Sequence, residues 1–517
     1  MRKARLFTML ALLGSVAIGP AQRAVAQGTD SPKQSLEDRL QLLEKELKRL
    51  QPLEQELKTL KTQLDEQKTA VTEREAAATQ KAQAVEQDLK ILKRQREVDK
   101  EVELAVAEKK AKEAPILTVG SKGIFVKSAD GNFGLKLGGQ LKTDSRTFLE
   151  DGGERLTDSF YISSARLIFD GTLFKEFEFR LAPEFGNGST QLIDGYIDWK
   201  HWNALKLRAG KTKGPVGLER LQSDVDNQFV SLGFPSSLAP NRDIGLQLYG
   251  DLFDGVLTYA AGVFNGTPDG ASADIDEHDS KELAARVFAH PFKKTDLKPL
   301  QGLGVGVAGT VGNRQGSAAT ATSNTALPSL KTPGQNTFFT YVTGANGAYA
   351  DGVEDRISPQ GYYYLGPFGL LGEYVISSQE VRRGTVNNQR IQNAAWQVAA
   401  SYVLTGENAS YKGVTPENPF SLAKGQWGAF EIAARIHELD VDDAAFTGIA
   451  ANRLADPTVS ATKATALGVG LNWYLSKNVK LMIDYEQTRF EGGAGAGASV
   501  QNRQDEKAVF GRLQVVF

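Results

Sequence analysis

The sequence of 517 residues contains no cysteine. Disulfides, thiolate chemistry and a lipid-modified N-terminal cysteine are therefore excluded. Histidine is scarce, and the four residues fall in different predicted turns and loops, so no Ser–His–Asp grouping is indicated. We expect no enzymatic activity, no cofactor and no metal ion.

Long apolar runs are also missing after the first 26 residues. No later window holds about 18 consecutive apolar residues, so no membrane-spanning helix is predicted. A net charge of −2 indicates no nucleic-acid partner. The mean hydropathy of −0.31 resembles that of soluble proteins. A membrane β-barrel escapes this test, because half of each strand is polar.

The N-terminus has the three parts of a secretory signal peptide. Arg2, Lys3 and Arg5 form a basic start, an apolar run covers 6–18, and small residues at 24–26 suit cleavage. We therefore assign residues 1–26 to a signal peptide. The rest of the chain is expected to reach the periplasm or beyond.

Residues 33–112 are almost free of glycine and rich in charge. Leu36, Leu40, Leu43, Leu47 and Leu50 follow a heptad spacing, which predicts a coiled-coil helix that associates with other copies. The leucine seam shifts at Pro52, where a kink or a fresh helix start is expected. The alternative is a partly disordered charged linker. Residues 113–132, with one proline and three glycines, are interpreted as a linker.

From residue 133 onwards the chain alternates between apolar and polar residues. The last strand ends on Phe517, with Val515, Leu513 and Gly511 on the same face, as in a strand with one face on lipid and one on a wet lumen. Segments of this kind predict an all-β transmembrane barrel over 133–517 with about sixteen antiparallel strands. This even count requires that residues 338–345 belong to the fifth external loop. One insertion, 212–242, is far longer than a turn.

Several segments of this region resemble the phosphate-selective porin O and P family. The most specific is Tyr411-Lys412-Gly413-Val414-Thr415-Pro416-Glu417-Asn418-Pro419-Phe420, and further matching segments lie at 164–167, 210–211, 219–220, 396–407, 425–431 and 471–485. The resemblance covers about 133–517 and implies a homotrimer of sixteen-stranded barrels. It also implies that the third loop, here 212–242, folds inward to narrow the pore. Selective members of the family line their pores with Arg and Lys.

Cations of this region are the candidate anion path and pore constriction. They are Lys211, Lys213, Arg220 and Arg242 in or beside the long insertion, and Lys206, Arg208 and Arg166 on strands. Neighbouring carboxylates such as Asp224 favour salt-bridged walls and a modest anion preference. Phe517 is interpreted as the assembly signal of the barrel.

These features predict a bacterial outer-membrane channel for passive diffusion of small hydrophilic solutes, especially inorganic anions such as phosphate. Outer-membrane lipid and lipopolysaccharide are expected to surround the barrel, with the coiled coil in the periplasm. The alternative is a structural barrel that tethers the outer membrane, with the coiled coil bound to cell wall or another partner. The sequence does not distinguish the transported solute.

Overall fold

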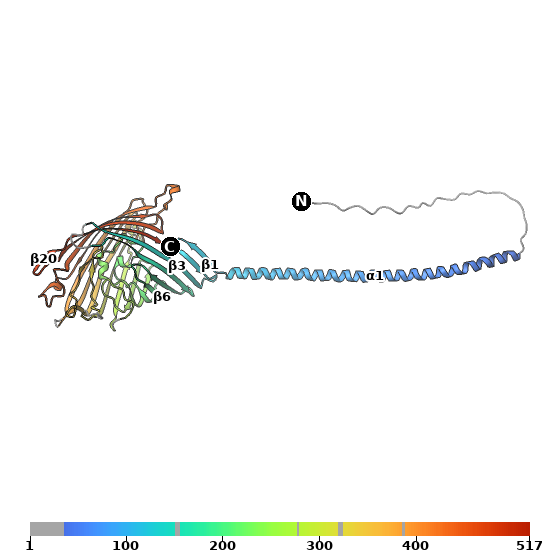
Figure 1. Cartoon of the computed structure of the whole chain (residues 1–517), viewed down its shortest axis with the longest axis horizontal. Helices are drawn as coiled ribbons and strands as arrows, with labels where there is room; N and C mark the ends of the chain where they lie inside the picture. The colour runs from blue at the N-terminus through green and yellow to red at the C-terminus, as the bar shows by residue number, and fades with distance from the viewer. Residues whose placement is uncertain (1–35, 150–155, 277–278, 319–323, 385–387) are drawn as a thin grey trace. The chain divides into compact units, whose positions relative to one another are not determined.

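The computed structural model describes residues 36–149, 156–276, 279–318, 324–384 and 388–517. The predicted signal peptide lies outside these ranges. Two kinds of structure follow each other along the described chain: one long helix and one large antiparallel sheet (Figure 1). None of the helices in the described ranges combines the length and the apolar character needed to cross a bilayer.

The helix α1 (Leu36–Glu113) has 78 residues and would be about 117 Å long at 1.5 Å per residue. It runs through Pro52 without interruption, so the expected fresh helix start there is wrong. The apolar side chains that are described along α1, including Leu40, Val98 and Val102, are exposed.

The segment 113–132, predicted as a linker, contains a β-hairpin. Its strands are β1 (Ile116–Gly120) and β2 (Gly123–Lys127). β2 pairs with the beginning of the first barrel strand, from Ile124 opposite Leu137 to Lys127 opposite Gly134. Gly123 has a φ of 96°, and a Cβ atom there would lie 2.1 Å from the carbonyl oxygen of Leu137. The glycines that suggested a flexible linker therefore form a tight turn against the barrel wall.

Sixteen strands of the described chain close into an antiparallel barrel, as predicted. They are β3 (Phe133–Phe148), β4 (Ser159–Leu173), β5 (Phe177–Glu184), β6 (Gln191–Trp202), β7 (Leu205–Thr212), β8 (Asp243–Leu252), β9 (Leu257–Phe264), β10 (Glu282–Ala289), β11 (Leu303–Gln315), β14 (Ala348–Leu365), β15 (Phe368–Arg383), β16 (Gln389–Val403), β17 (Ala429–Asp440), β18 (Ala461–Tyr474), β19 (Val479–Ala496) and β21 (Glu506–Val516). β21 closes the barrel by pairing with β3, from Ala508 opposite Phe148 to Val516 opposite Gln140. A short strand, β20 (Ser499–Asn502), extends the end of β19.

The barrel has a turn end and a loop end. The turn end holds the start of β3 and the end of β21, close to the C-terminus marked in Figure 1. Tight turns such as Gly366-Pro367, between β14 and β15, belong to the same end. The loop end holds the long connections, including loop 3 (213–242), loop 4 (265–281) and loop 5 (316–347). Residues 338–345 belong to loop 5, as the strand count required. There β12 (Leu330–Lys331) and β13 (Thr337–Phe339) form a separate two-stranded sheet.

The distribution of side chains is the inverse of that in a soluble protein. Outward residues are apolar and exposed: Val307 of β11 is 47% exposed. Inward residues are charged and covered: Lys142 of β3 is 3% exposed. Period-two alternation along each strand produces this arrangement, which suits a barrel with lipid outside and a polar interior.

Part of the interior is a small apolar core made by loops. Phe234 and Leu238 of loop 3 pack with Phe338 and Phe339 of loop 5, against inward residues such as Ile391. These loops therefore fill the lumen beside β15–β18. The open space lies on the other side, along β3, β4 and loop 4.

Candidate pore constriction

Loop 3 lies along the inner wall of the barrel. It begins after β7, contains the short helices α2 (Leu218–Leu221) and η1 (Phe234–Leu238), and returns to β8. Val216, Leu218 and Phe229 are nearly or fully buried within the lumen. The long insertion therefore folds inward, as the resemblance implied.

Wall residues from successive strands hold the backbone of loop 3. Lys142 of β3 donates to the carbonyl oxygen of Asp224 at 2.7 Å. Three further wall side chains donate to backbone carbonyl oxygens of loop 3. They are Gln514 of β21 to Val225 at 2.9 Å, Lys480 of β19 to Asn227 at 2.8 Å, and Asn472 of β18 to Gln228 at 2.9 Å. We call residues 224–231 the strap, because they cross the inner wall strand by strand.

Carboxylates of the wall also bind loop 3 before the strap, at 218–219, and at the last residue of the strap. Glu373 of β15 accepts from the backbone amides of Leu218 and Glu219. Ser231 donates to Glu486 of β19 at 2.9 Å and accepts from Arg435 of β17 through its carbonyl oxygen at 3.1 Å. Buried polar groups are stable when they are paired in this way, so loop 3 is held as a fixed part of the lumen.

Two large cavities in the described part of the barrel interior lie on either side of loop 3. The cavity toward the loop end has a volume of about 1560 Å³, and the cavity toward the turn end about 450 Å³. Arg166 and Asp224 line both cavities, and their side chains form an ion pair of 3.1 Å. This pair therefore stands where the two cavities meet.

Cations outnumber carboxylates on the walls of the two cavities. The twelve cations are Lys142, Arg146, Arg166, Arg180, Arg208, Lys213, Arg220, Arg242, Arg286, Arg314, Lys331 and Arg512. The seven carboxylates are Asp144, Asp194, Asp224, Asp251, Asp269, Asp274 and Asp276. Five further carboxylates lie behind these walls and pair with four of the cations: Asp170, Glu184, Asp198, Glu282 and Glu354.

The structure separates the predicted path residues into three groups. Arg166 and Arg220 line the larger cavity, and Lys213, Arg242 and Arg208 line the smaller one together with Arg166. Lys206 and Lys211 line neither cavity and pair with Asp251 and Asp274. Arg166 and Lys213 thus lie near Asp224, whereas Lys206 and Lys211 lie apart from both cavities.

Most of these cations have a carboxylate partner. Arg208 binds Asp198 through two nitrogens at 2.8 and 2.9 Å, and Arg242 lies 3.0 Å from Asp194. Two candidates have no carboxylate within 4.0 Å among the described residues: Lys213 and Arg220. Lys213 donates to the carbonyl oxygen of Gln222 at 2.7 Å.

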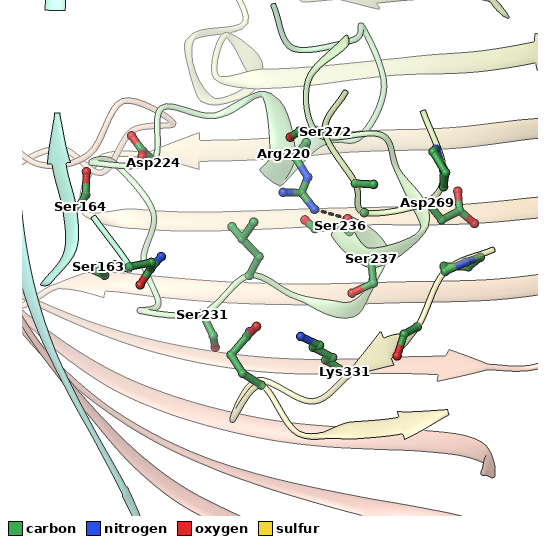
Figure 2. A pocket seen from close by; sticks show the side chains of 18 of the residues that line it. Ser163, Ser164, Arg220, Asp224, Ser231, Ser236, Ser237, Asp269, Ser272 and Lys331 are labelled. Atoms are coloured by element: carbon green, nitrogen blue, oxygen red, sulfur yellow. Dashed lines mark hydrogen bonds between the residues drawn. The ribbon is translucent and has the colours of Figure 1, made fainter. Parts of the chain in front are cut away.

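Arg220 reaches into the larger cavity among hydroxyl groups. Figure 2 shows its guanidinium beside Ser236, whose carbonyl oxygen it binds, with Ser231, Ser237 and Ser272 on the same walls. Its Nε atom is buried without a hydrogen-bond partner in the described chain. A guanidinium among hydroxyl donors is a suitable lining for an anion.

The electrostatics of loop 3 follow from this crowding. Burial opposes ionisation of Asp224, but Lys142 and Arg166 hold its pKa below the usual range. Burial and the nearby Arg242 lower the pKa of Lys213 to about 7. Burial raises the pKa of Asp226 to about 6. Near neutral pH, the charge of loop 3 therefore depends on pH.

The connection 404–428 and three cations of the larger cavity were not predicted from the sequence to belong to this site. The connection 404–428 at the turn end is long and reaches loop 3. The Tyr411 hydroxyl donates to the carbonyl oxygen of Leu218 at 2.6 Å, and the Tyr411 carbonyl oxygen accepts from the Gln222 side-chain amide at 2.7 Å. Arg146, Arg314 and Lys331 line the larger cavity from β3, β11 and β12. The length of 404–428, unusual for a turn-end connection, was the available signal for the first.

A closed barrel with an apolar exterior, a charged interior and an inserted loop between two polar cavities is an outer-membrane porin. A model of the family "Phosphate-selective porin O and P" matches residues 135–517, and the chain belongs to this family. It is therefore an outer-membrane channel for small anions such as phosphate.

Relatives and solved structures are similar over most of the chain. Porin O of Pseudomonas aeruginosa is 25% identical over 408 residues, which cover 71% of this chain and 85% of that protein. The outer-membrane channel DcaP of Acinetobacter baumannii has a TM-score of 0.48 at 11% identity and covers 76% of this chain and 99% of its own. An anion-selective porin from Comamonas acidovorans has a TM-score of 0.45 at 15% identity, with 74% and 100% covered.

Proposed function

We propose that anions cross this channel through a constriction at loop 3, with a modest preference over cations. The observation that carries the proposal is a set of five cavity cations that have no carboxylate within 4.0 Å among the described residues: Arg146, Lys213, Arg220, Arg286 and Lys331. A charged wall at close range favours counter-ions, because few water molecules lie between the ion and the fixed charge.

The preference is modest because most wall cations are neutralised. Arg166, Arg208 and Arg242 each have a carboxylate partner at 3.1 Å or less. Lys213 and Arg220 contribute more per residue, because no carboxylate neutralises them directly. We assign the path to Arg166, Lys213, Arg220 and Arg242, with Arg208 at the entrance from the turn end.

The same barrel is proposed to act as a passive pore without catalysis and to assemble as a homotrimer. The exposed apolar residues of α1 support self-association, since a helix with an unpaired apolar stripe gains stability by covering it. The alternative is a periplasmic tether that binds cell wall through α1. Binding of cell-wall fragments by the full chain, lost when residues 36–107 are deleted, would favour the tether.

Reversal potentials in a planar bilayer test the channel proposal. With a phosphate gradient across a bilayer that contains the purified protein, the sign of the reversal potential is expected to show that anions are preferred over cations. Arg220→Ala should shift it toward cations. Arg390→Ala is the matched control, because Arg390 binds Asp355 on the exposed outer face of the barrel. Equal shifts in both variants, or a cation-preferring wild type, would contradict the proposed path.

A further inference from the structure

The hairpin β1–β2 presents an apolar face that nothing in the described chain covers. Leu117 and Val119 of β1 are 65% and 72% exposed. Register places them beside Val126 and Ile124 of β2, which in turn lie beside Leu135 and Leu137 of β3. Side chains on one face of paired strands stand next to each other, so these six form one continuous apolar surface.

The hairpin is fixed to the barrel. Asn478, in the turn before β19, donates to the carbonyl oxygens of Ser121 in the hairpin turn and of Val516 in β21, each at 2.6 Å. Together with the pairing of β2 to β3, this makes the hairpin a rigid extension of the wall at the turn end. Its apolar face therefore has a defined orientation.

The open edge of β1 argues against lipid as the covering partner. β1 pairs with β2 on one side, and no described strand pairs with its other side. Backbone N–H and C=O groups without partners are costly in hydrocarbon, where water cannot replace the missing bonds. A protein partner can cover the apolar face and bind this edge.

The connection to α1 identifies the partner. α1 ends at Glu113, three residues before Ile116, and Val98, Val102 and Val106 continue an exposed apolar stripe toward that end. Three steps of the chain reach at most about 11 Å, and packed helices lie 8–10 Å apart. If helices of different copies associate, their Ile116 Cα atoms are within about 35 Å of one another. The β1 strands are then held close together.

We propose that the outer face of β1–β2, with Leu117 and Val119 at its centre, is an interface with a second copy of this chain. This inference rests on the proposed self-association of α1. The hairpin would then join the helical and barrel contacts between copies, which explains why a five-residue strand with an apolar face follows the helix so directly.

Single-cysteine labelling of the full chain tests the interface, because the natural sequence has no cysteine. A nitroxide at Val119→Cys is expected to be immobile, poorly accessible to both oxygen and a water-soluble nickel chelate, and within about 35 Å of its copies. Thr118→Cys, on the opposite face of the same strand, should be accessible to nickel. Val307→Cys, on the exposed outer face of β11, should give much longer distances.

Each other outcome overturns the inference in a distinguishable way. A Val119 label accessible to oxygen but not to nickel would place the hairpin in lipid, and a mobile label accessible to nickel would place it free in water. Sedimentation in detergent is measured first: a monomer would overturn the proposed assembly as well. An assembly with long Val119 distances would overturn the hairpin interface alone.

Charge substitution gives an independent readout. Val119→Lys should lower the temperature at which the assembly dissociates in detergent, while Thr118→Lys leaves it unchanged. Equal effects of the two variants would contradict the proposed face.

Discussion

Lys142 of β3 holds Asp224 of loop 3 twice: its Nζ donates to the Asp224 carbonyl oxygen at 2.7 Å and lies 3.3 Å from the Asp224 carboxylate. Lys142 thus positions the backbone of loop 3, and it also forms an ion pair with a carboxylate that binds Arg166. The position of loop 3 and the charge of the pore are therefore coupled at this point.

Asp224→Asn is expected to increase anion preference. The amide keeps the shape of the side chain but removes the charge that neutralises Lys142 and Arg166. A unit charge at about 6–8 Å from the ion path changes the permeability ratio on the order of 3- to 10-fold. Reversal potentials in a salt gradient measure this ratio, and an unchanged value would remove Asp224 from the path.

Arg220→Ala and Arg242→Ala should both decrease anion preference, the former more strongly. Arg220 has no carboxylate partner among the described residues, whereas Asp194 neutralises much of the charge of Arg242 at 3.0 Å. The single-channel reversal potentials of the two variants test this order, and Arg390→Ala should behave as wild type.

Anion preference is expected to fall as pH rises from about 6 to 8. Lys213, whose pKa is about 7, is charged below that pH and becomes neutral above it. Asp226, with a pKa of about 6, gains a negative charge over the lower part of the range, which acts in the same direction. Lys213→Met should abolish the upper part of the pH response, and Asp226→Asn the lower part. A response unchanged in both variants would assign it to other groups.

Shortening loop 3 should increase single-channel conductance and weaken selectivity. The strap is held by hydrogen bonds from at least four strands, so deletion of residues 224–231 opens the junction of the two cavities. Unchanged conductance and selectivity in a folded variant would place loop 3 outside the ion path.

Loss of the terminal aromatic residue should prevent assembly. Phe517 exchanges two backbone hydrogen bonds with Gly139, at 2.9 and 3.0 Å, and its ring occupies the space where a side chain at 139 would stand. Deletion of Phe517 should reduce barrel yield in the outer membrane, whereas Phe517→Tyr should preserve it. The shift in gel mobility on heating measures folded protein, and normal yield after deletion would contradict the predicted role.

The strands were predictable because their signal is local. Alternation of apolar and polar residues along segments such as 133–143 identifies a strand with two different surroundings. An even count then required that 338–345 be a loop, and the structure places those residues in loop 5. The hairpin at 116–127 was missed, because Gly120 and Gly123 in such short segments resemble the glycines of a linker.

The pore path was only partly predictable. The sequence by itself determined that the chain forms a barrel, that it has one long insertion, and which Arg and Lys residues are present near it. Alternation, segment length and residue type can all be read along the chain without knowledge of distant contacts. Only the closed tertiary structure decided that Lys142, Gln514, Lys480 and Asn472, from strands at both ends of the sequence, bind consecutive parts of loop 3. Those partners meet because β21 pairs with β3, and that long-range closure also decides which cations face Asp224 and which are neutralised elsewhere.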